Sequence, residues 1–145
     1  MATRFHDIYN MFLNQITTSE FAGLSEEDFD DILQQHLLSA LLIVQESMTD
    51  VMDVDLENKQ FNNDLHLAEQ IILAKAMKLA WLRKHKHSED LMRQQVSDRD
   101  YKIESGAVYL KNLGEQEQAL AKEIRIDLVK FSYSRAEFTS GLLGN

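Results

Sequence analysis

Two histidines in the middle of the chain are the first candidates for chemistry. His85 and His87 flank Lys86, and a His-x-His pair can bind a metal ion on a β-strand, where alternate side chains point the same way. This stretch is predicted to end a helix, however, and residues two apart on a helix do not share a face. Arg83, Lys84 and Lys86 also place positive charge where a cation would bind. We therefore predict no metal site here.

Carboxylates are the second candidates. Five crowd the start of one predicted helix: Glu26, Glu27, Asp28, Asp30 and Asp31. Paired carboxylates can do acid–base work or bind divalent cations, but calcium loops need alternating ligands and a turn glycine, which this stretch lacks. A solvated first helical turn is the more ordinary interpretation. One enzyme hypothesis remains, in which Glu69 or Asp64 faces His66 across a pocket between helices.

Motifs for covalent catalysis or cofactor binding are missing from the sequence. Ser105-Gly106 and Ser140-Gly141 are not part of a GxSxG elbow. The glycines are isolated, so there is no glycine-rich phosphate loop. The chain has no cysteine, which excludes disulfides, thiolate zinc sites and cysteine nucleophiles. We predict a protein that is not an enzyme and uses no cofactor.

Helical periodicity predicts how these residues are positioned. Apolar residues recur at spacings of three and four along most of the chain, and the absence of proline permits long helices. Ser25 has the sequence signature of a helix cap, and Gly114 that of a helix end. Residues 49–60 are predicted to be a loop, and residues 88–95 one or two extra turns. The helices are expected at about 4–16, from Ser25 to Glu46 or Met48, at 61–84, from Ser97 and Asp100 to Gly114, and at 115–132.

The predicted fold class is therefore all-α, a small bundle of four to five helices with an extended C-terminal arm. The bundle domain is expected over residues 1–132 and the arm over 133–145. The arm is rich in glycine and serine, yet it contains Phe138, Leu142 and Leu143. Large apolar groups on such a short tail favour binding to another protein.

Charge is distributed unevenly along the chain. Residues 1–70 contain 14 acidic and 2 basic residues, whereas residues 71–145 contain 10 acidic and 13 basic ones, for a net charge of −9. A chain this acidic is a poor general nucleic-acid binder. If the two halves form opposite faces, identical copies attract head to tail; solvated charged faces are the plainer alternative. The basic region around Trp81 and Tyr101 could touch nucleic acid, although an acidic protein surface is favoured.

Targeting signals are not evident. The N-terminus lacks the apolar core of a signal peptide, and the longest apolar stretch, Leu37 to Val44, is too short to span a bilayer. We expect a product made in the cytosol that has no membrane partner.

Four segments together resemble the head–tail connector (portal adaptor, or neck) proteins of tailed phages. The first two are LSEEDFDDILQQHLLSALLIVQESM at 24–48 and FNNDLHLAEQIILAKAMKLAWLRK at 61–84. The others are VSDRDYKIESGAVYLKNL at 96–113 and FSYSRAEF at 131–138. The resemblance covers about residues 21–138, and the predicted helix at 4–16 is additional to the simplest members.

The resemblance implies a structural protein of the virion neck, made in the host cytoplasm. Such proteins form a homo-oligomeric ring, twelve-fold, that joins the portal protein to a tail or stopper protein and lets DNA pass through its channel. The implied portal-docking residues are Phe131, Tyr133, Phe138, Leu142 and Leu143. The implied contacts between subunits join Glu26, Glu27 and Asp30 to Arg83, Lys84 and Lys86. A cytosolic helical protein-binding module, such as a regulator or assembly chaperone, remains the alternative.

Overall fold

The computed structural model describes residues 2–16, 23–96 and 103–143, except for the side chains of 92–96, 103–107 and 135–143. The described residues form four α-helices: α1 (Phe5–Leu13), α2 (Glu26–Val44), α3 (Leu67–Val96) and α4 (Ile103–Leu143). A short 3₁₀ helix (Asp50–Met52) and a two-stranded hairpin of β1 (Val54–Asp55) and β2 (Gln60–Phe61) separate α2 from α3. The predicted all-α class is confirmed.

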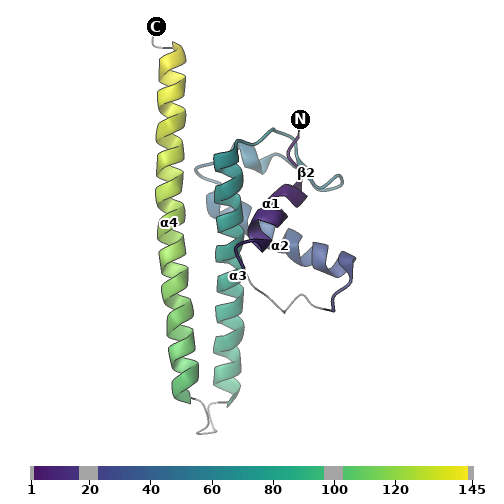
Figure 1. Cartoon of the computed structure of the whole chain (residues 1–145), viewed down its shortest axis with the longest axis vertical. Coiled ribbons are helices and arrows are strands. Elements are labelled where there is room, and N and C mark those ends of the chain that lie inside the picture. Colours follow the sequence, from purple (N-terminus) through teal and green to yellow (C-terminus); the bar gives the residue numbers. More distant parts are fainter. Residues whose placement is uncertain (1, 17–22, 97–102, 144–145) are drawn as a thin grey trace.

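Helix α3 is the centre of the molecule: α4 runs alongside it, and α1 and α2 also pack against it, with α2 crossing behind it in the view of Figure 1. Each helix buries the stripe that its periodicity predicts. From α1, Phe5, Ile8 and Phe12 are fully buried. They belong to one core with residues of the two longer helices. These are Leu33, Leu37, Ala40, Leu41 and Val44 from α2, and Ile72, Leu73, Ala76, Met77 and Leu79 from α3.

The predicted start of α2 is confirmed in detail. Ser25 has an extended backbone, and its hydroxyl oxygen accepts a hydrogen bond from the Asp28 backbone N–H at 3.2 Å. Serine at this position satisfies an N–H that has no partner within the helix. The acidic residues of the first turn, Glu26 and Glu27, are exposed. This first turn is thus explained by local sequence alone.

The loop predicted at 49–60 is a hairpin instead, and it holds the N-terminus. Val54 pairs with Phe61 and Asp55 with Gln60. The chain just before α1 joins this hairpin, because the Phe61 N–H donates to the Thr3 carbonyl at 2.7 Å. The Thr3 hydroxyl then accepts from the Leu65 N–H at 2.9 Å. A strand of two residues is too short to show an alternation of apolar and polar side chains, so the sequence pattern indicated neither this hairpin nor its contact with the N-terminus.

Helix α3 differs from the prediction at both ends. It begins at Leu67 rather than at residue 61, because Phe61 belongs to β2. Its start is fixed by Glu69, whose carboxylate accepts a hydrogen bond from the His66 backbone N–H at 3.1 Å. At the other end the helix continues through His87 to Val96 without the predicted stop. Cations at 83–87 favour a helix end but do not impose one.

The two C-terminal helices predicted at about 97–114 and 115–132 are a single helix, α4. Gly114 lies inside α4, and the helix also continues past Ser132 to Leu143, so the breaks predicted at these two positions are wrong. The predicted cap at Ser97 and Asp100 lies outside the described residues. A glycine inside a helix costs only about 1 kcal/mol, which packing against α3 can offset.

Helices α3 and α4 run antiparallel in a register that places α4 beyond the bundle. Lys86 meets Glu117, and Lys75 meets Asp127, so the start of α3 at Leu67 lies opposite about residue 135. The remaining turns of α4 continue past this point, and Figure 1 shows the yellow end of α4 rising above the rest of the molecule. The predicted arm at 133–143 is therefore a helical extension of the bundle.

Candidate interaction surfaces

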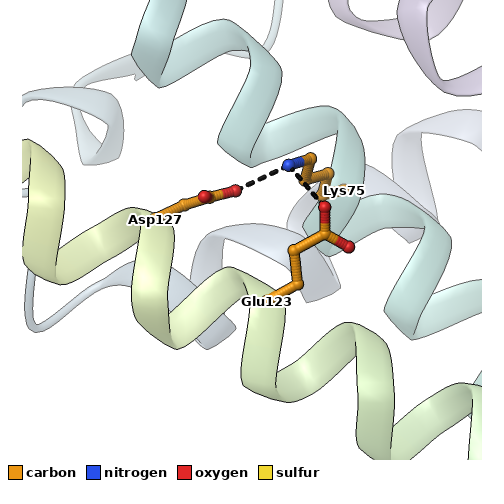
Figure 2. A network of polar contacts seen from close by, with 3 residues as sticks. All are labelled: Lys75, Glu123 and Asp127. Atoms are coloured by element: carbon orange, nitrogen blue, oxygen red, sulfur yellow. Dashed lines mark hydrogen bonds and ion pairs between the residues drawn. The ribbon is translucent and has the colours of Figure 1, made fainter.

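Two ion-pair clusters attach α4 to α3. In the first, the Lys75 ammonium lies between the carboxylates of Glu123, at 3.0 Å, and Asp127, at 2.6 Å (Figure 2). Burial opposes the charged form of Lys75, but the hydrogen bonds to Asp127 and Glu123 outweigh it and raise the pKa of the ammonium. Because Glu123 and Asp127 are four residues apart, they share one face of α4. That face is thereby fixed toward α3.

The second cluster lies nearer the start of α4, at Glu117. Glu117 accepts hydrogen bonds from Arg83 and Lys86, both at 3.1 Å. Burial alone would raise the pKa of Glu117, but the two cations outweigh it and lower the pKa. Between the clusters, Leu120 and Ile124 are buried against α3. The interface between α3 and α4, which we call the α3–α4 seam, therefore alternates ion pairs with apolar contacts.

Three of the predicted contact residues between subunits have partners within the chain. Arg83 and Lys86 bind Glu117. Asp30 of α2 forms an ion pair with Lys59, which lies between the two strands of the hairpin. Hydrogen bonding to Asp30 raises the pKa of Lys59. Two others, Glu26 and Glu27, are exposed.

The sixth predicted contact residue, Lys84, lines a hollow. This hollow of about 390 Å³ lies between the start of α2 and the middle of α3. Its lining includes Lys84, the buried His36, and the half-buried Trp81 and His85. Whether any of the six residues contacts another subunit stays a prediction.

An aromatic stack occupies part of the α3–α4 seam. The His85 ring stacks on Trp81 with centroids 5.6 Å apart and rings 9° from parallel. The His85 Nε2 and the Tyr109 hydroxyl of α4 are 2.7 Å apart. His85 thus has structural neighbours on two helices.

Among the described residues, no group of three or more His, Asp or Glu is placed to hold a metal ion.

The enzyme hypothesis paired Glu69 or Asp64 with His66. Glu69 is fully buried, but one carboxylate oxygen caps α3 through the His66 backbone N–H. The His66 and Asp64 side chains are exposed. The contact that the structure gives Glu69 is thus the one expected of a helix-capping carboxylate.

The predicted portal-docking residues all lie on α4. Phe131 is half-buried against the core, whereas Tyr133 is 69% exposed. Phe138, Leu142 and Leu143 belong to the helix, but their side chains are outside the described part of the structure. Next to Phe131, the start of α3 and the end of the seam form an apolar groove of about 360 Å³. Its lining includes Ala68, Ile71, Lys75, Lys130, Phe131 and Ser134.

A second face of α4 was missed by the sequence analysis. Opposite the stripe that packs on α3, Ile126 and Val129 are 44% and 55% exposed, and Tyr133 continues the same line. Exposed cations flank this line, and a shallow hollow of about 560 Å³ lies over it. We call this surface the basic face of α4 and define it as Lys122, Arg125, Ile126, Val129 and Lys130. The spacing of 126, 129 and 133 was the available signal.

Helix α2 carries a matching surface of opposite charge. Leu38 and Leu42 are 37% and 63% exposed on the side of α2 that points away from the core. Exposed Asp31 precedes them on the same side of the helix, and exposed Glu46 follows just beyond its end. We call Asp31, Leu38, Leu42 and Glu46 the acidic face of α2.

The charged residues of both faces are unpaired within the described part of the chain. None of Asp31, Glu46, Lys122, Arg125 and Lys130 forms an ion pair with another described residue. Asp31 adds to the effect of Asp30 in raising the pKa of Lys59 but forms no ion pair itself. All five charges can therefore form ion pairs with a partner.

Two further observations bear on what the molecule does. Among the described residues, no helix is long and apolar enough to cross a bilayer. No protein-family model, curated protein or solved structure matches this chain.

Proposed function

We propose that the protein is a structural virion protein, the head–tail connector of a tailed phage. In this proposal a homo-oligomeric ring, twelve-fold as in the family it resembles, joins the portal to a tail or stopper protein in the virion neck. The chain acts by binding other proteins, so it needs no active site or cofactor. An acidic molecule, with a net charge of −9, would let DNA pass through the ring without binding to it.

The projection of α4 beyond the bundle is the observation that carries the proposal. Helix α4 is paired with α3 only as far as about residue 135, and the following turns rise above the molecule (Figure 1). A projecting helix can enter a groove of a partner without any change in the bundle. Tyr133 is largely exposed at the base of this projection. Aromatic side chains at such positions often supply much of the binding energy of an interface.

The proposal is tested by removing residues 133–145 and mixing the shortened protein with portal rings from the genome that encodes it. The bundle should fold, because α4 keeps both ion-pair clusters and nearly all of its contact with α3. The helical circular-dichroism signal should fall only by the deleted turns. Binding to the portal, measured by co-sedimentation and by negative-stain imaging, should be lost. Full-length Val108→Ser is the matched control, because Val108 is equally exposed near the other end of α4. A truncated protein that still decorates portal rings would refute the proposal.

A cytosolic helical protein-binding module is the second candidate function. The apolar groove beside Phe131 favours it, since grooves between helices commonly bind an amphipathic helix of a partner. Ile71 is 40% exposed at this groove, so Ile71→Ser should weaken binding of such a partner and leave portal binding unchanged. Portal binding by the wild type that Ile71→Ser retains favours the connector, whereas binding of an amphipathic helix without any portal binding favours the module.

A further inference from the structure

The acidic face of α2 and the basic face of α4 are complementary in both charge and apolar content. On α2, Leu38 and Leu42 lie one turn apart between Asp31 and Glu46. On α4, Ile126 and Val129 lie one turn apart between Lys122 and Lys130. Each surface is thus an exposed apolar pair between two like charges, and the charges have opposite sign. Residues three or four apart on a helix make such continuous surface patches.

We infer that the basic face of α4 binds the acidic face of α2 of a second copy of this chain. The inference rests on the self-assembly in the proposed function and names the surfaces that carry it. Apolar side chains of the two faces cover one another, and the flanking carboxylates pair with the flanking cations. Interfaces of this kind have an apolar centre with charges at the rim.

The positions of the two faces determine the kind of assembly. The two faces belong to different helices, α2 and α4, and both helices pack against α3 (Figure 1). A contact between two different surfaces leaves one of each unoccupied on every dimer. It therefore continues into a closed ring or an open filament. The symmetric alternative, α4 against α4, would bring Lys122, Arg125 and Lys130 of both copies together, and like charges at an interface oppose binding.

Cross-linking can test this directly, because the chain has no cysteine of its own. The double variant Leu42→Cys/Ile126→Cys places one thiol on each face. Treated with a short bis-maleimide, alone and on portal rings, it should give a ladder of dimers, trimers and higher oligomers. The matched control, Leu42→Cys/Leu67→Cys, has its second thiol at an equally exposed position outside both faces. It should give no ladder.

Charge reversal tests the pairing independently. One variant carries Lys122→Glu, Arg125→Glu and Lys130→Glu, so both of its faces are acidic. The other carries Asp31→Lys and Glu46→Lys, so both are basic. Each alone should associate at least tenfold more weakly than the wild type in sedimentation velocity, whereas an equimolar mixture should recover association. Recovery should weaken as salt rises, because screening reduces attraction between exposed charges.

Three results would overturn the inference. They are a ladder no larger than a dimer, a dimer formed by Ile126→Cys alone, and charge-reversed variants that do not recover on mixing. Portal binding is measured in the same samples, so the proposed function is judged separately. Variants that bind portals as isolated subunits would refute the interface and leave the connector proposal standing. A ladder from Leu42→Cys/Ile126→Cys without portal binding would support the interface and refute the connector proposal.

Discussion

Replacing Lys75 by methionine tests how α4 is attached to α3. Methionine retains most of the apolar stem of lysine and removes the ammonium that lies between Glu123 and Asp127 (Figure 2). The Lys75 and Asp127 side chains are 23% and 26% exposed, whereas Glu123 is 54% exposed. A partly buried charged hydrogen bond contributes about 1.5 kcal/mol, and an exposed ion pair about 0.5 kcal/mol. Lys75→Met should therefore lower the free energy of unfolding by about 2 kcal/mol.

Urea unfolding followed by circular dichroism measures this change, and the melting temperature should fall by about 6 °C. A double-mutant cycle with Asp127→Asn isolates the pair and should give a coupling free energy of about 1 kcal/mol. The cycle with Glu123→Gln should give less than half of that, since Glu123 is the more exposed partner. Lys111→Met is the control, because Lys111 is exposed on α4 outside both faces, and it should change stability by less than about 0.5 kcal/mol.

The pH dependence of the same variant has a definite sign. The folded-state pKa of Lys75 is raised, so its contribution is complete below the unfolded-state pKa and is lost as pH rises through the higher folded-state value. Wild-type stability should therefore fall more steeply than that of Lys75→Met above about pH 10. Equal slopes, or a coupling free energy indistinguishable from zero at low salt, would refute the assignment of this ion pair to the attachment of α4.

Three further substitutions have clear expected outcomes. Gly114→Ala should raise the free energy of unfolding by about 1 kcal/mol, because alanine is the better helix former. The added Cβ fits, since its nearest neighbour would be Lys86 at an ordinary 3.8 Å. A destabilised variant would mean that α4 is interrupted at this point. Thr3→Val should lower it by about 1–2 kcal/mol by leaving the buried Leu65 N–H without its acceptor, and unchanged urea unfolding would contradict that hydrogen bond. Glu117 has a lowered folded-state pKa, so its contribution is lost as pH falls through that value. Glu117→Gln should accordingly flatten the stability curve below about pH 4.5, and a curve parallel to the wild type would contradict the second ion-pair cluster.

Local signals predicted some elements well. Ser25 followed by acidic residues specified both the start and the chemistry of α2, because a cap and its partner are three residues apart in sequence. In the helix predicted at 4–16, Phe5, Ile8 and Phe12 are buried on one face, since helical spacing alone determines which residues share a face. Both signals lie within one or two turns of helix.

Longer-range signals were misread. Gly114 is a common residue at a helix end, but here α4 continues through it against α3. Phe61 fitted the stripe of α3, yet its N–H donates to Thr3, 58 positions away in the chain. Such pairing between distant segments leaves no local pattern. In both places tertiary contacts override a local preference of about 1 kcal/mol.

The candidate surfaces show the same division. Helical periodicity identifies an apolar stripe on α4 that contains Leu120 and Ile124, and both residues are buried. The line of Ile126, Val129 and Tyr133 has the same spacing, so periodicity alone cannot say which of two stripes faces the core. That choice follows from Glu117, Glu123 and Asp127, which bind cations of α3 and so rotate the other stripe outward.

An outward apolar stripe on a long helix has a physical consequence. A 41-residue helix is roughly 60 Å long, and α3 accompanies only part of it. Isolated helical turns are marginally stable in water and depend on packing. The exposure of Ile126, Val129 and Tyr133 on the side away from α3 therefore leaves much of α4 supported along one edge. A partner that covers the basic face stabilises the helix at the place where its own bundle does not, so assembly and the rigidity of the projecting end are coupled.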